Sequence, residues 1–172
     1  MTDVASVIRE ALTSLEVEFD EPNGQTFVAL LPGEHKLRTT CSIVVGVHSV
    51  TVNAFVMRHP DESADAVHRW LLTQNARHPG LAWGVDHLGD VYLIGQLPLS
   101  AVHVDEIDAL LGRVLDTADS AFNTLLEIGF ASSIRREWRW RVSRGESLAN
   151  LSAFTHMFDA HEAGSQSRTV EP

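Results

Sequence analysis

The chain has 172 residues, of which 44% are hydrophobic, and carries a formal net charge of -10 with a pI near 5.2. This length predicts one domain with a sizeable core, because domains most often contain roughly 100 to 150 residues. The acidic balance argues against DNA or RNA as a partner, since neutralisation of phosphates by Lys and Arg dominates nucleic-acid affinity.

The single cysteine and the N-terminal sequence bear on the cellular compartment. Cys41 cannot form an intrachain disulfide, and its place among inward positions of a strand pattern suits a buried thiol in a reducing compartment. The first residues, MTDVASVIRE, contain no apolar region, and no apolar stretch approaches the roughly 20 residues of a membrane span. We therefore expect a cytoplasmic protein that does not insert into a membrane.

In the first third of the chain, the apolar spacing predicts one helix followed by strands. Apolar residues from Val4 to Leu15 recur at helical spacing. Val17 and Phe19 then lead into a hairpin turn at 22–25, whose Asn and Gly tolerate positive φ. Period-two alternation predicts three long antiparallel strands, at 26–31, 35–45 and 50–57.

The second half of the chain adds two helices and one more hairpin. A helix is predicted at 61–76, two strands at 81–85 and 91–97, and the longest helix from Asp105 to near Gly129. The order helix, three strands, helix, two strands, helix is typical of an α+β fold on a mostly antiparallel sheet.

The segment after the long helix differs in composition. It contains the sequence IRREWRWRVSR, with five arginines and two tryptophans, and we favour a helix over a strand because residues 131–133 can cap one. Ser143 with Glu146 predicts a capping box for a further helix, and the last residues, AGSQSRTVEP, are predicted to be disordered. The expected organisation is therefore an α+β domain at 1–130, a C-terminal helical extension at 131–160 and a disordered tail at 161–172.

No motif with a clear catalytic mechanism occurs in the sequence. The patterns GxSxG, GK[ST], GxGxxG and HExxH are all missing, and no two histidines are four residues apart. Asp86, His87 and Asp90 form the most tempting cluster, but they lie in a predicted turn, where Asp is favoured for backbone reasons. Asp61 and Glu62, beside His59, are interpreted as first-turn carboxylates that complement a helix dipole. We expect no catalytic residue, no metal and no cofactor.

The Arg and Trp segment has two interpretations. Arginine and tryptophan are typical of binding surfaces, which predicts a partner-binding site. Alternatively, the arginines pair with carboxylates of the long helix (Asp116, Asp119 or Glu127) while the tryptophans pack internally. The candidate partner-binding residues are Arg135, Arg136, Trp138, Arg139, Trp140 and Arg141.

Three stretches carry a resemblance to a known family: VNAFVMRHPDESADAVHRWLLTQN, VDHLGDVYLIGQLPL and FNTLLEIGFASSIRREWRWRVSRGE. Together they resemble the actinobacterial branch of the YbjN family, described as bacterial sensory transduction regulators. The resemblance implies a fold like that of class I type III secretion chaperones, with the same order of elements as predicted above. The family's shared fold ends with the long helix, and this chain departs from it by an extra C-terminal helical segment. The resemblance implies no catalytic residues and gives no role to the chain beyond about Glu146.

The combined expectation is a non-enzymatic, regulatory or chaperone-like protein that binds a protein or peptide and forms a homodimer. One alternative is a small-molecule sensor or enzyme that uses a cleft between sheet and helices, near His87 or His59. Another is a structural subunit, which would expose a broad apolar patch as an isolated chain. An enclosed polar pocket would favour the sensor or enzyme, and an open groove would favour the protein binder.

Overall fold

The computed structural model describes residues 3–158 and contains one sheet of six antiparallel strands, ordered β1-β2-β3-β4-β6-β5. The predicted α+β fold is confirmed, and the segment at Val17 and Phe19 leads into a full strand. The strands are β1 (Glu18–Asn23), β2 (Thr26–Pro32), β3 (Arg38–Val45), β4 (Ser49–Met57), β5 (Leu81–Val85) and β6 (Val91–Pro98). The helices are α1 (Val4–Ser14), α2 (Ala64–Asn75) and α3 (Val104–Arg144), with short 3-10 turns η1 (Leu99–Ala101) and η2 (Ala149–Phe154).

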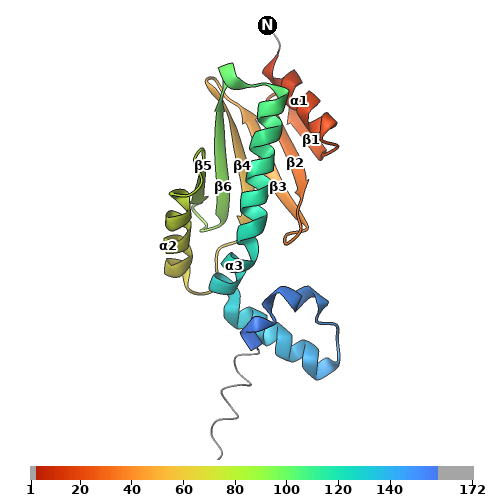
Figure 1. Cartoon of the computed structure of the whole chain (residues 1–172), viewed down its shortest axis with the longest axis vertical. Helices are drawn as coiled ribbons and strands as arrows, with labels where there is room; N and C mark the ends of the chain where they lie inside the picture. Colours follow the sequence, from red (N-terminus) through yellow and green to blue (C-terminus); the bar gives the residue numbers. More distant parts are fainter. Residues whose placement is uncertain (1–2, 159–172) are drawn as a thin grey trace, which may run out of the picture.

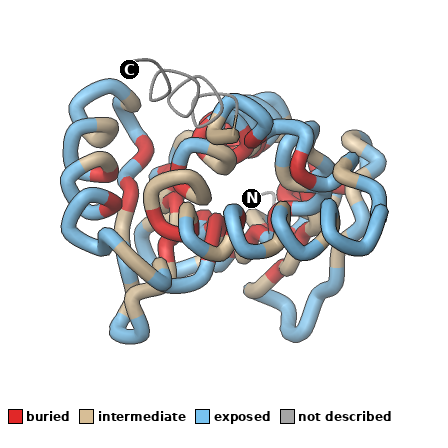
Figure 2. Tube along the Cα trace, turned by 90° about the horizontal axis from the view of Figure 1, so that it is seen from below, coloured by how far each residue is buried: buried red, intermediate tan, exposed pale blue. Residues whose placement is uncertain are grey.

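In the part of the chain that the structure describes, helices cover one face of the sheet and leave the other open. Helices α1 and α3 cross the front of the sheet, and α2 lies beside β5 (Figure 1). Alternate residues of the strands point toward these helices and are buried, as expected for antiparallel strands with one face on a core. Buried residues therefore lie on the interior sides of the elements (Figure 2). The largest fully buried side chains include Ile8, Leu12, Phe27, Ile43, Leu93, Ile107, Leu110 and Leu125.

Both edges of the sheet are protected against pairing with another strand. At β5, the side chain of Asn75 accepts a hydrogen bond from the Trp83 N–H (2.6 Å) and donates one to the Trp83 carbonyl (3.2 Å). At the other edge, β1 carries Asp20, Glu21 and Pro22, and its pairing with β2 is irregular after Asp20. Charge, proline and irregular register all disfavour edge pairing. A partner is therefore expected to contact side chains on a face rather than add a strand.

The loop between β2 and β3 is held on α3 by Asp119. The carboxylate accepts hydrogen bonds from the backbone N–H groups of Glu34, His35 and Lys36, at 2.9 to 3.2 Å, and lies 2.9 Å from the His35 ring Nδ1. Gly33 is needed beside it, because a Cβ there would collide with the Asp119 carboxylate. Burial favours the neutral acid, but the N–H donors and His35 outweigh it and hold the pKa of Asp119 below its ordinary value.

Helix α3 has a kink at Phe130, where φ is -140° and ψ is 20°. The carbonyl of Gly129 accepts hydrogen bonds from the N–H groups of Asp61 (3.0 Å) and Glu62 (3.1 Å). The Glu62 carboxylate in turn accepts hydrogen bonds from the N–H (2.5 Å) and hydroxyl (2.9 Å) of Ser132. Glu62 thus caps the second part of α3 in the manner of an N-cap residue, although it comes from a distant loop.

Two local predictions are wrong, because a distant contact or a continuing helix prevails. Asp61 and Glu62 precede α2 and bind the kink of α3 instead of starting their own helix. The predicted end of the long helix near Gly129 coincides with the non-helical Phe130, and the second part of α3 then runs to Arg144. Ser143 therefore lies in the last turn of α3, where its hydroxyl donates to the Trp140 carbonyl, and the short 3-10 turn η2 replaces the predicted capped helix. The predicted disordered tail at 161–172 lies outside the described residues.

We expect Asp119→Asn to lower the free energy of unfolding by about 2 kcal/mol, because an amide NH2 would face backbone N–H donors. The folded-state pKa of Asp119 is below its unfolded value, so its contribution is complete above about pH 4 and is lost as the pH falls through the folded-state pKa. Urea titrations at several pH values should show a flatter acid limb for the variant. Asp116→Asn, one turn earlier at an exposed position, is the matched control and should change little.

We expect Glu62→Ala to loosen residues 131–158 while leaving the sheet intact, because the N–H of Ser132 loses its acceptor. Hydrogen exchange followed by mass spectrometry should show severalfold faster exchange in peptides that start near Ser132, and unchanged exchange in β3 and β4. Asp65→Ala, an exposed acidic residue in the first turn of α2, is the control. Equal acceleration in both variants would contradict the capping role of Glu62.

Candidate partner-binding surfaces

Asp86 and Asp90, which the sequence offered as a candidate reactive cluster with His87, accept hydrogen bonds from backbone N–H groups. The Asp86 carboxylate accepts hydrogen bonds from the N–H groups of Leu88 and Asp90, both at 2.9 Å. Asp90 accepts one from the His59 N–H at 2.7 Å, which ties the hairpin to the end of β4. Within residues 3–158, no three His, Cys, Asp or Glu side chains form a group that could hold a metal ion. The turn interpretation therefore accounts for these carboxylates.

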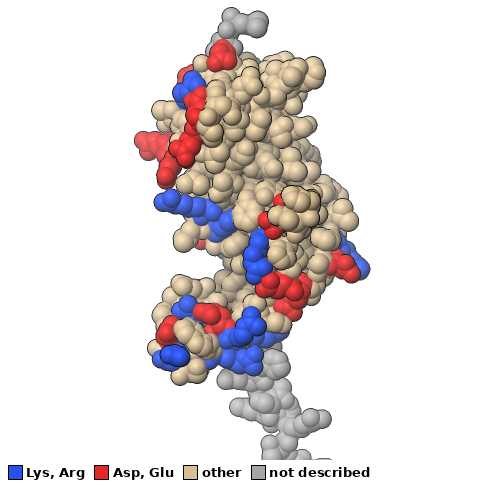
Figure 3. Space-filling model, turned by 180° about the vertical axis from the view of Figure 1, so that it is seen from behind, with Lys and Arg blue, Asp and Glu red and all other residues tan. Residues whose placement is uncertain are grey.

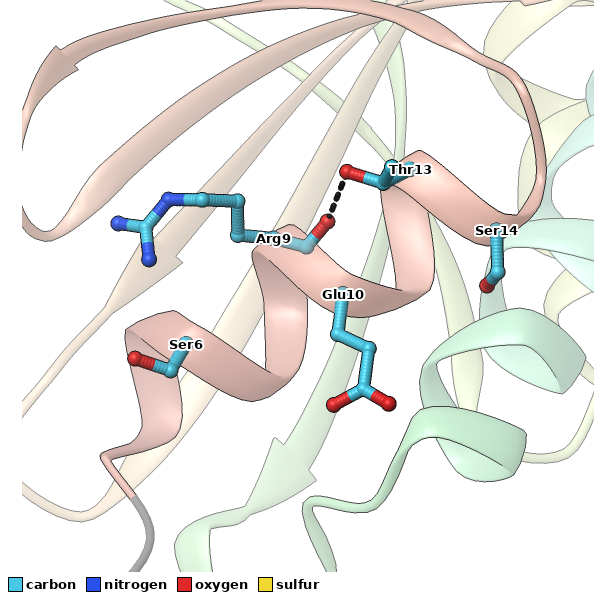
Figure 4. A pocket seen from close by; sticks show the side chains of 5 residues that line it. All are labelled: Ser6, Arg9, Glu10, Thr13 and Ser14. Carbon is cyan, nitrogen blue, oxygen red and sulfur yellow. Dashed lines mark hydrogen bonds between the residues drawn. The ribbon is translucent and has the colours of Figure 1, made fainter.

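The surface hollows do not assemble a reactive site. The hollow on α1, of about 430 Å³, is lined by residues of that one helix (Figure 4). Its side chains spread along the helix surface, the Thr13 hydroxyl donates to the Arg9 carbonyl, and Arg9 already pairs with Glu21 at 2.7 Å. Neither His59 nor His87 lines this hollow or those beside α2 and the 33–36 loop.

Two side chains with strongly shifted pKa values have structural roles. Burial raises the pKa of the Cys41 thiol to about 12, which makes it a poor nucleophile and fits the predicted packing role. Burial lowers the pKa of Lys36 to about 8, and its ammonium group donates to the carbonyls of Phe55 (2.6 Å) and Val56 (2.9 Å). Lys36 thus links the loop that Asp119 holds to the end of β4.

The C-terminal extension, residues 131–158 as described by the structure, is docked through one side of its helix. The ring of Trp138 stacks on Phe158 with centroids 4.1 Å apart and an interplanar angle of 16°. Arg141 donates to the Glu137 carboxylate (2.7 Å) and to the Ser147 carbonyl (3.0 Å). Leu151 and Phe154 of η2 are buried against the same helix. These inward residues therefore hold the segment 147–158 against the second part of α3.

The opposite side of the same helix is exposed and basic. We define the arginine face as Arg135, Arg136, Arg139, Trp140 and Val142. Trp140 is 43% exposed and Val142 is 56% exposed. Within residues 3–158, no carboxylate forms a salt bridge with any of these three arginines. The six predicted site residues are thus divided: four lie on the arginine face, whereas Trp138 and Arg141 point inward.

The predicted ion pairs between these arginines and the long helix are wrong. Asp119 is occupied by the 33–36 loop, and Glu127 lies 3.1 Å from the ring of His156. Asp116 is exposed and forms no salt bridge with an arginine of the extension. The kink at Phe130 separates the part of α3 that carries these carboxylates from the part that carries the arginines.

The uncovered face of the sheet is a second surface, and sequence reasoning missed its character. We define the open sheet face as the outward residues of β2 to β6, apart from Pro32, Arg38, Ser49 and Pro98 at strand ends. The face consists of Thr26, Val28, Leu30, Thr40, Ser42, Val44, Thr51, Asn53, Phe55, Ala82, Gly84, Tyr92, Ile94 and Gln96. Arg38 is the one charged residue among all the outward positions of these strands. Charged residues lie beside this face, on β1 (Glu18 and Asp20) and at the start of β3, where Arg38 lies 3.4 Å from Glu18. Figure 3 shows this broad uncharged region from behind. The sequence signal was the scarcity of charged residues at every second position of these strands.

The fold is an α+β fold of the type III secretion chaperone-like class, and a C-terminal extension follows it. The chain belongs to the YbjN family, whose model, described as "Putative bacterial sensory transduction regulator", matches residues 5–127. The family resemblance read from the sequence is therefore confirmed. Among residues 3–158, no helix is long and apolar enough to cross a membrane.

Relatives and solved structures support this assignment. An uncharacterized protein of Mycobacterium tuberculosis is 50% identical over 159 residues, which cover 90% of this chain and 87% of the relative. One of Mycobacterium leprae is 46% identical over 172 residues, covering 97% of this chain and 94% of the relative. YbjN from E. coli matches with a TM-score of 0.54 and 13% identity, over 71% of this chain and 92% of its own.

Two chains from protein complexes share the fold at similar levels. A chain of the ExsC-ExsE complex has a TM-score of 0.56 and 18% identity, over 71% of this chain and 92% of its own. A chain of the ExoU-SpcU complex of Pseudomonas aeruginosa has a TM-score of 0.53 and 18% identity, over 69% of this chain and 96% of its own. The extension lies beyond the family model, whereas the match to the M. leprae relative, at 97% of the chain, includes it.

We expect Trp138→Ala to destabilise the extension much more than Trp140→Ala does. Loss of the Trp138 stack should destabilise the extension by about 2 kcal/mol, since a half-buried aromatic packs there. Trp140→Ala should change it by less than about 0.5 kcal/mol, as is usual for exposed positions. Hydrogen exchange across residues 131–158 distinguishes the two. Equal protection in both variants would contradict the division of the helix into inward and outward sides.

Proposed function

We propose that this chain is a non-enzymatic, regulatory or chaperone-like protein that binds a protein or peptide partner. The observation that carries the proposal is the open sheet face. About a fifth of the chain is charged (21%), so the 18 outward positions of β2 to β6 would be expected to include about four charged residues, and they include one, Arg38 at the start of β3. Depletion of charge, aromatic residues in the middle and charge at the rim are features of protein interfaces.

The structural comparisons support a binding role at the level of the fold. The ExsC-ExsE and ExoU-SpcU structures are complexes of two proteins, and each includes a chain of this fold. Because both sheet edges are protected here, the proposed contact uses side chains of the open sheet face, such as Phe55 and Tyr92, whose rings meet edge to face at 5.5 Å. The buried Cys41 thiol supports a cytoplasmic location.

We further propose that the chain forms a homodimer through this face. Two copies of an uncharged face can pack together in a two-fold interface without burying an unpaired charge. The size of the face limits the strength of this contact. With strands about 4.8 Å apart and about 3.3 Å per residue, it covers roughly 500 Å² per copy, below the roughly 800 Å² of a standard interface. The dimer is therefore expected to be weak and concentration-dependent, and to give way to a partner that binds the same face.

Asn53→Glu tests this proposal, because it places a charge at the centre of the open sheet face. The variant should fold with an unchanged melting temperature, lose the dimer in sedimentation velocity runs at tens of micromolar, and lose partner proteins captured from the native cytosol. Leu72→Glu is the control, since Leu72 is 71% exposed on α2, away from this face. If the Asn53 variant captures the same partners as the wild type, the open sheet face is not the binding surface.

A further inference from the structure

We propose that the arginine face binds an acidic segment of a partner protein, one that presents carboxylates about one helical turn apart beside an apolar side chain. This inference rests on the proposed binding of a protein partner and specifies the chemistry of one part of that partner. The bound segment would lie along the outward side of α3 between Arg135 and Val142.

The distribution of charge makes the extension basic, although Glu62, beside its start, lies close enough to Arg135 for the two charges to interact. Residues 3–130 contain seven Lys and Arg against 18 Asp and Glu, a net charge of -11, whereas residues 131–158 contain five Arg against two Glu, a net charge of +3. Both glutamates of the extension lie near Arg141 on the inward side, at 2.7 Å for Glu137 and 3.9 Å for Glu146. The positive charge of the extension is therefore concentrated on its outward side.

The arrangement of the side chains suits carboxylates. Arg135 and Arg139 are one turn apart on α3, so their guanidinium groups can bind two carboxylates spaced about 6 Å apart. Each guanidinium can bind a carboxylate with two parallel hydrogen bonds, which a Lys cannot do. In the extension, Arg136 donates only to the Ser133 hydroxyl and Arg139 only to the Arg135 carbonyl, so most of their donors face solvent.

The apolar part of the face supplies an anchor next to these charges. Trp140 and Val142 flank Arg139 and are both substantially exposed. Packing does not require them, because Trp138, Leu151 and Phe154 already close the extension from its inward side. Exposed tryptophan beside arginine is a combination that is enriched at the energetic centres of protein interfaces.

The acidic body favours a protein segment over other anions. Negative charge on residues 3–130 repels a long nucleic acid or an anionic membrane, both of which extend well beyond the +3 region. Screening over about 8 Å at physiological salt still permits a short acidic segment to bind locally. The kink held by Glu62 directs the extension away from the end of the sheet (Figure 1), and basic side chains lie next to the uncharged region in the view from behind (Figure 3). We therefore expect that one partner can contact both surfaces.

The experiment uses the full chain and a fluorescein-labelled synthetic helical peptide with Glu at i and i+4 and Leu between these positions. A second peptide replaces each Glu by Gln. Fluorescence anisotropy in 50 mM salt should show at least tenfold tighter binding of the Glu peptide. Arg135→Gln with Arg139→Gln should raise its Kd at least tenfold, and Trp140→Ala about threefold or more. The matched control, Arg77→Gln with Arg113→Gln, removes the same charge from exposed positions on the body and should change the Kd less than twofold.

Several results would overturn the inference. These are no binding of the Glu peptide up to 1 mM, equal binding of the Gln peptide, and equal weakening in the two double variants. Tighter binding of phosphatidylglycerol vesicles or single-stranded DNA than of the peptide, with the same dependence on Arg135 and Arg139, would assign the face to those ligands instead. Asn53→Glu separates the two proposals, because it should leave peptide binding unchanged. Loss of cytosolic partners in that variant without any peptide binding by the wild type would retain the proposed function and reject this inference.

Discussion

Helix α3 lies across the sheet and buries Ile107, Leu110, Val114 and Leu125 against the inward residues of β3, β4 and β6. This contact determines which surfaces remain free. Together with α1, it covers one face, and within residues 3–158 no element covers the other. A sheet with one covered face usually alternates buried apolar and solvated polar residues. Here the second set contains polar and apolar residues and one charged residue, Arg38, a composition that supports the proposed interface.

The same helix also carries the second surface, and the kink makes this possible. A straight α3 would continue past the end of the sheet in the direction set by the core. At Phe130 the helix changes direction. There the Gly129 carbonyl accepts hydrogen bonds from the N–H groups of Asp61 and Glu62, and the Ser132 N–H donates to the Glu62 carboxylate. Arg58 supports the contact by lying 4.5 Å over the Phe130 ring while it binds Asp61 at 2.7 Å. The orientation of the arginine face is therefore fixed by a loop more than sixty residues away.

The sequence predicts well those features that depend on local period. Alternation over 35–45 and 50–57 identified the central hairpin and the buried Cys41, although β3 begins at Arg38, and helical spacing identified α1 and most of α3. The features it missed depend on contacts between distant residues. Asp119 binds a loop 83 to 85 residues earlier, and Glu62 caps a residue 70 positions later, so neither role has a local signature. For the Arg and Trp segment, the sequence left open whether the tryptophans pack internally or bind a partner. In the structure both tryptophans lie on one helix, with Trp138 stacked on Phe158 and Trp140 exposed on the opposite side.

The two surfaces differ in the physical terms that they contribute to binding. An uncharged face provides area but little long-range attraction, and its roughly 500 Å² is modest. An exposed arginine cluster adds attraction that accelerates encounter and depends on salt, but a few solvated ion pairs add little affinity alone. A partner that contacts both surfaces gains more than either provides, since the second contact forms within one complex at high effective concentration. In the proposed scheme the homodimer and the complex with an acidic partner compete, because both use the open sheet face. A partner that also binds the arginine face would displace the dimer, since the dimer has the contact of the open sheet face alone.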